Sequence, residues 1–351
     1  MMRTNPDVLV IGGGVIGLTS AYLLAKSGLR VEVVDKGEMG REASWAGAGI
    51  LPPWGDGEYA TPLDRLRAYS VSRFEALSAE LRELTGIDNE YHVCGGVEYL
   101  DIDDYDQPEL WRREGVRHER FDSFRGSDLF FLDYAQVRNP RHLRALIQAC
   151  RRLGVLLTPN RPYTDRRAAE CGAVVIATGA WADDLAGQNG VRPVHGEMIL
   201  FGPDDNDPQQ AHTGLLLHGK RYLVPRKDGR VLAGSTEQPE FGYTKRTTAE
   251  ACAALRMFAI SLRPCLGARS VEAAWSGLRP GSPDGLPFIG PIPDQPGAII
   301  AAGHFRAGIQ TSLGTAECVR ALVLGEPPPV PLEAFAPGRT PHPPMRTAFR
   351  S

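Results

Sequence analysis

Residues 8–17 read Val-Leu-Val-Ile-Gly-Gly-Gly-Val-Ile-Gly. The apolar run at 8–11 is typical of a short buried strand, and Gly12, Gly14 and Gly17 follow it at GxGxxG spacing. The first glycine of such a turn permits a sharp bend, the second lets the backbone approach a pyrophosphate, and the third lets a helix pack closely on the sheet. The helix that begins here would direct free N–H groups and its positive dipole end at phosphates. The stretch therefore predicts a dinucleotide-binding strand–helix unit.

A second strand, predicted over 31–34, delivers Asp35 to its carboxyl end. A carboxylate there can accept hydrogen bonds from both ribose hydroxyls, and it would repel a 2′-phosphate, so NADP is disfavoured. A GxGxxG turn alone is weak support for this interpretation. The strand, helix, second strand and acid arrive in order, which favours dinucleotide binding over a purely structural turn. NAD and FAD both remain open at this point.

Length, charge and cysteine content narrow the class of protein. The chain has 351 residues, enough for one large domain or two interleaved ones. Its net charge of -3 offers no electrostatic case for binding nucleic acid or an anionic membrane. The first residues lack signal-peptide features and no apolar stretch reaches membrane-spanning length, so we expect a cytoplasmic location. The six cysteines are scattered, which predicts reduced thiols and no structural metal.

Helical signals follow the first unit. Small residues fill 40–50, and this stretch fits either close backbone approach to a flat ligand or an ordinary helix packed on the sheet. Thr61, followed by Pro62, predicts the N-cap of one long amphipathic helix that ends at Gly86. A second capped helix is predicted from Asn139 to Gly154. The apolar stripes of both helices are explained by core packing.

The rest of the chain alternates between two kinds of pattern. The run at 173–176 suits the same parallel sheet as the first strand, so that sheet would be discontinuous in sequence. Between 193 and 275 the pattern is one of short strands and turns, interrupted by a helix with Thr247 and Glu250 at capping-box spacing. A last strand at 298–302 leads into a helix over 308–324. A proline-rich tail then begins near Glu326 and cannot sustain regular hydrogen bonding.

Four segments in order carry a resemblance to a known family. They are the glycine-rich opening, Ala-Thr-Gly-Ala-Trp at 177–181, Gly-Leu-Arg-Pro-Gly at 277–281, and Gly-His-Phe-Arg-Ala-Gly-Ile at 303–309. Together they resemble the FAD-dependent D-amino-acid oxidase superfamily, and most closely its glycine oxidases of the thiamine-biosynthesis type. The similarity runs to about residue 330.

The resemblance implies an α/β fold of the D-amino-acid oxidase type. In that fold a discontinuous, Rossmann-like FAD-binding domain carries an inserted antiparallel-sheet substrate domain. We expect the FAD-binding domain at 1–62, 140–195 and 276–330, the substrate domain at 63–139 and 196–275, and the proline-rich tail at 331–351.

The resemblance also implies the reaction. Non-covalent FAD would oxidise glycine, sarcosine or small D-amino acids by hydride transfer to flavin N5. The products would be an imine or 2-oxo acid, ammonia and hydrogen peroxide, with oxygen as the electron acceptor. The imine could supply thiamine thiazole synthesis, and the family suggests a homo-oligomer.

Four residues are expected at the substrate. By the resemblance, Arg279 binds the substrate carboxylate as a bidentate pair, a task that suits the guanidinium fork. Tyr222 would touch the same carboxylate, Arg306 would be the second active-site arginine, and Ile50 stands where methionine is common beside the flavin. We expect no acid–base residue, because His304 in such a loop is more often a hydrogen-bonded structural residue.

A larger set is expected to hold the cofactor through backbone groups, the ribose carboxylate and small side chains. In the family, the helix after Gly308 directs its N-terminus at the flavin N1 and C2 carbonyl. The expected residues are Gly12, Gly14, Val15, Ile16, Gly17, Asp35, Lys36, Ser44, Gly47, Ala48, Gly49, Val174, Gly179, Trp181, Gly303, Arg306, Ala307, Gly308 and Ile309.

Several functions compete with an oxidase. The nearest are a D-amino-acid dehydrogenase of the same superfamily with another electron acceptor, and a sarcosine or N-methyl amino-acid oxidase. More distant are an NAD-dependent dehydrogenase built on the same fingerprint and a flavin-binding scaffold without turnover. The chain departs from the family pattern at Asp35, where glutamate is usual, at Ala307, where asparagine is common, and in residues 154–172, which lack a clear strand hairpin.

Overall fold

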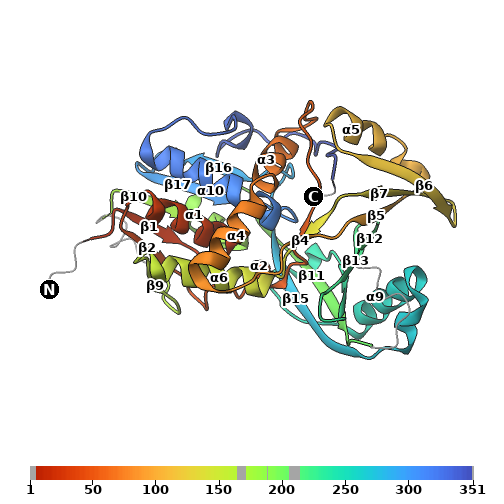
Figure 1. The fold of residues 1–351 in the computed structure, drawn as a ribbon. Coiled ribbons are helices and arrows are strands. Elements are labelled where there is room, and N and C mark those ends of the chain that lie inside the picture. The colour runs from red at the N-terminus through yellow and green to blue at the C-terminus, as the bar shows by residue number, and fades with distance from the viewer. Residues whose placement is uncertain (1–4, 164–170, 188, 205–213, 350–351) are drawn as a thin grey trace.

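The structure is a computed structural model that describes residues 5–163, 171–187, 189–204 and 214–349. Figure 1 shows two layered halves side by side, each built around a sheet. The predicted domain ranges also include residues 1–4, 164–170, 188, 205–213 and 350–351, which lie outside the described residues. No helix in the described ranges is long and apolar enough to cross a membrane.

One half is a mainly parallel sheet, as predicted. Within the described residues its strands run in the order β16 (Phe288–Pro291), β17 (Ala298–Ala302), β10 (Ala173–Ile176), β1 (Val8–Ile11), β2 (Val31–Val34) and β9 (Leu156–Thr158). β10 and β17 come from far along the chain and pair in parallel beside β1, so the predicted discontinuous sheet is confirmed. β9 pairs with β2, so part of the stretch 154–172 forms an outer strand.

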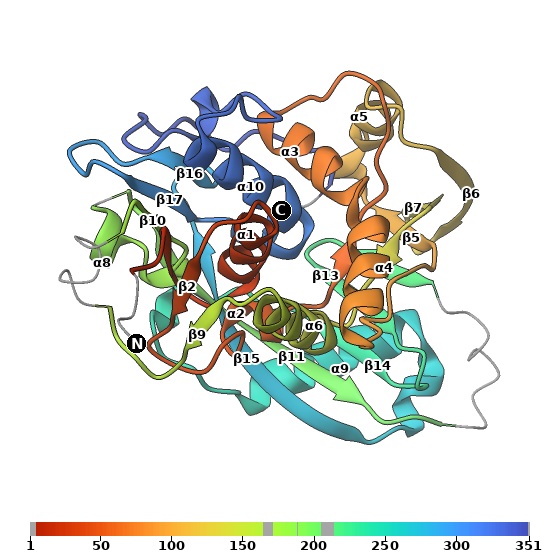
Figure 2. The same cartoon turned by 60° about the vertical axis from the view of Figure 1, so that its left-hand side comes forward.

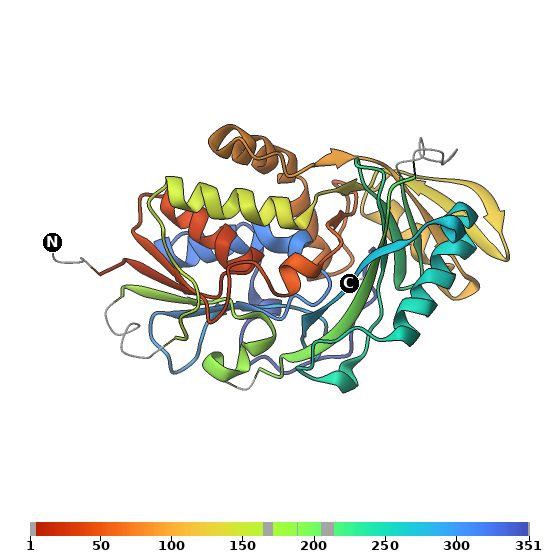
Figure 3. The same ribbon diagram turned by 90° about the horizontal axis from the view of Figure 1, so that it is seen from below.

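Helices cover one face of this sheet. Figure 3 shows them as a layer over the strands, and they are α1 (Val15–Lys26), α6 (Asn139–Arg152) and α10 (Gly308–Leu324). Buried side chains of β1, β2 and these three helices form a single apolar cluster, which includes Leu18, Leu146 and Val319. Burying apolar surface contributes about 25 cal/mol per Å², so the packing of these helices on the sheet stabilises this half.

The other half is a larger, mixed sheet. Its described strands run β15 (Val271–Gly281), β11 (Arg192–Phe201), β14 (Val231–Gly234), β13 (Arg221–Pro225), β12 (Leu215–His218), β5 (Gly96–Leu100), β7 (Ser127–Leu132) and β6 (His118–Phe124). The neighbouring pairs are antiparallel except β12 and β5, which run parallel. Figure 2 shows α9 (Ala249–Leu262) beneath β11 and β14, where its side chains form an apolar cluster with theirs.

The chain reaches this sheet through shorter elements. α2 (Ala43–Ala46) follows β2, and a small sheet of β3 (Ile50–Leu51), β8 (Ala135–Gln136) and β4 (His92–Val93) lies between the halves. α5 (Gln107–Arg113), which the sequence pattern did not predict, packs near β6. The predicted boundaries at 195/196 and 275/276 fall inside β11 and β15, which pair along their whole length. The domain boundaries themselves stay a prediction.

Three helix predictions need correction. The long helix predicted from Thr61 to Gly86 is two helices, α3 (Pro62–Val71) and α4 (Phe74–Thr85). The Arg73 N–H donates to the Ser70 carbonyl at 3.3 Å and the Ser72 hydroxyl donates to the Tyr69 carbonyl at 3.0 Å, so the regular backbone hydrogen-bond ladder is interrupted there. The N-cap of α9 is Thr248 rather than Thr247, and its side chain accepts from the Ala251 N–H at 3.2 Å.

The third correction concerns the start of α6, where Asn139 is predicted to cap the helix but does not. The Asn139 amide donates instead to the Ser44 carbonyl at 2.7 Å and ties α6 to α2. The predicted cap of α3 is confirmed, since the Thr61 hydroxyl accepts from the Asp64 N–H at 3.1 Å. As far as residue 349, where the described part of the chain ends, the proline-rich tail is irregular apart from one short 3₁₀ turn at Glu333–Phe335.

A buried carboxylate beside α3 makes stability depend on pH. Glu114 is 3% exposed, and burial together with nearby Asp64 raises its pKa to about 7. The unfolded value is about 4.3, so the native state holds this proton more tightly. The stabilising contribution of Glu114 is complete below about pH 4.3 and is lost as the pH rises through 7.

We therefore expect Glu114→Gln to melt higher than the unmodified protein at pH 8, on the order of 2 °C or more, with a smaller gain at pH 5. Thermal denaturation at both pH values measures this difference. Glu109→Gln, on the exposed side of α5, is the matched control and should give no gain at pH 8. An equal effect of Glu114→Gln at both pH values would contradict the assignment.

Candidate active site

A close crossing of backbones shapes the turn after β1. Gly12 has a φ of 107°, and a Cβ on it would lie 2.3 Å from the Ala177 carbonyl oxygen at the end of β10. A Cβ on Gly17 would lie 1.9 Å from the Gly12 carbonyl oxygen. Side chains at either position would push β1, β10 and α1 apart. The first and third glycines of the motif therefore have the packing roles that their spacing predicts.

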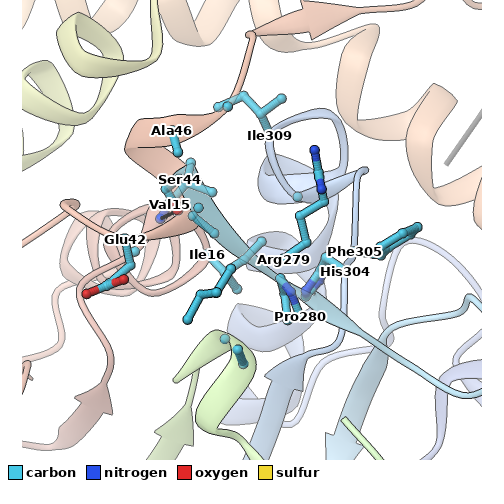
Figure 4. Close-up of a pocket in the computed structure, with 18 of the residues that line it drawn as sticks. Val15, Ile16, Glu42, Ser44, Ala46, Arg279, Pro280, His304, Phe305 and Ile309 are labelled. Carbon is cyan, nitrogen blue, oxygen red and sulfur yellow. Dashed lines mark hydrogen bonds between the residues drawn. The ribbon is translucent and has the colours of Figure 1, made fainter. Parts of the chain in front are cut away.

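The N-terminus of α1 opens into a cavity. Gly14 precedes the helix and supplies no side-chain cap, and the Val15 N–H donates to the Ser44 hydroxyl at 2.9 Å. Figure 4 shows Ser44 and Val15 close together, with Ile16 beside them on the cavity wall. The N–H groups of the first turn of a helix have no carbonyl partner within that helix. Together with a serine hydroxyl, they form a suitable site for phosphate oxygens.

Asp35 lies at the carboxyl end of β2, on the same wall. One of its carboxylate oxygens accepts from the Gly13 N–H at 2.7 Å and the other from the Gly37 N–H at 2.8 Å. A carboxylate offers about four acceptor positions, so both oxygens keep capacity for ribose hydroxyls. Nearby, the Lys36 ammonium stands 3.6 Å from the centre of the Trp181 ring, and burial lowers the pKa of Lys36.

Buried polar contacts hold the small residues 47–49 against the cavity. A Cβ on Gly49 would lie 2.0 Å from the Val137 carbonyl oxygen. The Arg226 guanidinium donates to the Ala48 carbonyl at 2.7 Å and to the Val137 carbonyl at 3.1 Å. Burial lowers the pKa of Arg226 to about 10, so it stays charged at neutral pH. Sequence analysis missed this positioning role, although Arg226 follows the strand that carries Tyr222.

A second helix N-terminus, that of α10, faces the cavity from the other side. Gly308 and Ile309 line the wall, and Ile50 stands opposite on β3, where its carbonyl accepts from the Gln310 amide at 3.3 Å. The His304 ring bonds the Thr315 hydroxyl at 3.0 Å, and burial lowers the pKa of His304 to about 3. His304 is therefore neutral at physiological pH, and its contact with Thr315 of α10 is buried.

The other end of the cavity centres on Arg279, which lies on β15. Its guanidinium donates to the Ser235 hydroxyl at 2.6 Å and to the Thr236 carbonyl at 3.1 Å. A Cβ on Gly196 would lie 2.1 Å from an Arg279 nitrogen, so a side chain there would displace the guanidinium. Tyr222 lines the same wall from β13, and a hydrogen bond between it and Arg279 opposes the fall in pKa that burial causes at Arg279.

Arg306 also reaches the cavity, but its guanidinium nitrogens already have hydrogen-bond partners within the protein. It pairs with Glu237 at 2.8 Å, and Glu237 pairs with Lys220 at 2.9 Å. Burial alone would raise the pKa of Glu237, but its bonds to Lys220 and Arg306 outweigh burial and hold it low. The structure thus places Arg306 on the cavity wall with a carboxylate partner that the sequence analysis missed, because the two residues are distant in the chain.

Most predicted residues line one continuous cavity of about 460 Å³. Of the predicted cofactor residues, all of them described, four lie off its wall: Gly17, Val174, Gly303 and Ala307. Gly17 and Val174 lie in the packing behind the wall, and Ala307 directly precedes α10. Among the described wall residues, the Thr178 hydroxyl and the amide oxygens of Asn139 and Gln310 are buried without a hydrogen-bond partner. A long polar ligand that spans both halves fits this combination.

Comparison with known proteins gives this cavity a family. The family model described as FAD dependent oxidoreductase matches residues 7–322. The chain belongs to this family. Its cofactor is FAD, as predicted, and the described fold is the predicted α/β fold of the D-amino-acid oxidase type.

Individual members of the family are similar over nearly the whole chain. A glycine oxidase of Pseudomonas putida is 35% identical, with 95% of this chain and 98% of that protein covered. A bifunctional protein ThiO/ThiG of Synechocystis is 31% identical over 98% of this chain, which corresponds to 56% of that protein. The crystal structure of glycine oxidase from Geobacillus kaustophilus superposes with a TM-score of 0.86 at 30% identity, covering 95% of this chain and 99% of that one.

The position of Asp35 predicts how FAD is retained. Asp35→Ala would remove the expected acceptor for ribose hydroxyls, and a hydrogen bond to a charged group contributes about 1.5–3 kcal/mol. We expect the dissociation constant for FAD to rise about 10- to 100-fold, measured by fluorescence titration of apoprotein. Asp128→Ala, at an exposed ion pair on β7, is the control and should retain FAD normally. Unchanged retention in Asp35→Ala would remove Asp35 from the FAD site.

Proposed function

We propose that this chain is a glycine oxidase. Glycine, water and oxygen would be converted to glyoxylate, ammonia and hydrogen peroxide, and sarcosine and small D-amino acids would react in the same way. The observation that carries the proposal is the single cavity that joins the GxGxxG turn and Asp35 at one end to Arg279 at the other. The names of the most similar relatives agree with it.

Arg279 would bind the substrate carboxylate. Its guanidinium already donates to Ser235 and Thr236, and these bonds fix its orientation before a ligand arrives. A fork held in this way presents parallel N–H groups to two carboxylate oxygens. The Tyr222 hydroxyl would add a further contact, and its ring would keep water from that side of the ligand.

When bound, FAD supplies the acceptor for the two electrons of the substrate C–H bond. The chain's own contribution is to orient the α-carbon, because Arg279 and Tyr222 fix the carboxylate at one end. We assign no acid or base to the wall. The substrate would react as the free amine, and its proton would pass to solvent before binding.

The N-terminus of α10 would stabilise negative charge that develops in the reaction. The backbone N–H groups near Gly308 and Ile309 face the cavity from the start of a long helix. Their partial positive charge favours an anion at that position, and the effect is larger where water is excluded. We also propose that the imine product serves thiamine synthesis. The cytoplasmic location and the homo-oligomer stay predictions.

Anaerobic reduction tests the proposed function directly. Glycine, sarcosine, D-alanine or D-proline added to the holoprotein without oxygen should bleach the flavin absorbance near 450 nm. Admission of air should restore the absorbance and release hydrogen peroxide. Bleaching that only an artificial acceptor reverses would show a dehydrogenase, and no bleaching by any of the four would contradict the proposal.

Arg279→Ala should raise the Michaelis constant for glycine about 10- to 100-fold, because a charge-assisted pair contributes about 1.5–3 kcal/mol. Arg279→Lys keeps the charge but loses the fork, so we expect an intermediate value. Steady-state peroxide assays measure all three proteins, with Arg120→Ala on the outer strand β6 as the control. A Michaelis constant in Arg279→Ala equal to that of the unmodified protein would place the carboxylate elsewhere.

A further inference from the structure

The proline-rich tail returns to the middle of the molecule. It leaves α10 at Leu324, and Arg339 ties it to Asp284 through two bonds of 2.8 Å. Figure 1 shows the last described part of the tail returning to the region between the two halves, and Ala348 contacts Asp64 of α3 there. The matched family model stops at residue 322, so the tail lies beyond the part of the chain that defines the family.

Residues 346–349 pack into a slot between α3 and α5, where side chains of both helices hydrogen-bond to the backbone of the segment. Ala348 is 1% exposed, its carbonyl accepts from the Trp111 indole N–H at 2.7 Å and from the Gln107 amide, and its N–H donates to Asp64 at 3.3 Å. Arg346 pairs with Asp106 at 2.6 Å. Buried polar groups that satisfy a backbone N–H and C=O in this way fix the position of the segment.

This anchor places the Phe349 ring in the wall of the FAD and substrate cavity. Phe349 is 6% exposed, stacks on Trp111 with ring centres 6.3 Å apart, and meets Tyr134 edge-on at 6.0 Å. It belongs to one apolar cluster with Met198, and Tyr222 packs against that cluster. Phe349, Tyr134, Met198 and Tyr222 all line the cavity that contains Arg279.

We infer that Phe349 is a specificity-determining residue, which limits the size of the substituent on the substrate α-carbon. The inference rests on the proposed function, because Arg279 must hold the carboxylate for the substituent to have a defined direction. With that end fixed, the apolar wall of Phe349, Tyr134 and Met198 bounds the space left for a side chain. A rigid, buried ring leaves enough room for the α-hydrogen atoms of glycine but excludes branched substituents on the α-carbon.

The test measures binding of simple carboxylates, which need not turn over. Acetate stands for glycine without its amine, and 4-methylpentanoate carries an isobutyl group. Each is titrated into holoprotein, and the shift in the flavin absorbance gives its dissociation constant. Phe349→Ala should shift the ratio of the two constants at least about 10-fold in favour of 4-methylpentanoate. The ratio of kcat/KM for D-leucine to that for glycine should move in the same direction.

Two further variants keep the result decisive. Met345→Ala changes an exposed side chain of the tail and should leave both constants unchanged. Phe349→Leu keeps an apolar side chain in the slot and should give an intermediate ratio, so it decides the matter if Phe349→Ala fails to fold. An unchanged ratio in a folded Phe349 variant overturns the inference. If the unmodified holoprotein neither binds acetate nor is bleached by glycine, the proposed function fails instead.

Discussion

The contact between the Gly12 turn and the Ala177 carbonyl is the constraint on which the site depends. A Cβ at Gly12 would stand 2.3 Å from that oxygen, so only glycine lets the ends of β1 and β10 meet. Because they meet, α1 starts beside the carboxyl ends of the parallel strands, the region where open α/β sheets bind ligands. Asp35 on the neighbouring strand then faces the same cavity. One close approach of backbones therefore sets the position of the whole FAD-binding end.

The Arg279 end of the cavity depends on a different kind of contact. Arg279 and Arg226 are largely buried cations whose donors are directed by carbonyl and hydroxyl oxygens of loop residues from other parts of the chain. Burial costs each charge part of its hydration, and the surrounding acceptors offset that cost. The arrangement leaves Arg279 oriented before a carboxylate arrives. Arg306 differs, because Glu237 already occupies its fork, so the two arginines are not equivalent partners for a substrate.

Much of this could be predicted from sequence, and the exceptions have a common cause. The strands, the glycine turn and the positions of Asp35 and Arg279 follow from local patterns or from motifs in order along the chain. Glu237 and Phe349 could not be predicted, because their roles depend on tertiary contacts between distant segments. The break between α3 and α4 was missed because the apolar residues keep their helical spacing across Ser72. The backbone helix, however, ends at Val71 and a new one begins at Phe74.

The central claim is that one cavity holds FAD and directs an amino acid carboxylate at Arg279. A crystal structure of the holoprotein with glycolate, which has the carboxylate of glycine but a hydroxyl for its amine, tests it most directly. The account predicts both glycolate carboxylate oxygens on the Arg279 guanidinium, with the α-carbon facing the flavin ring. Glycolate bound at Lys220 or Arg306, without contact to Arg279, would contradict it.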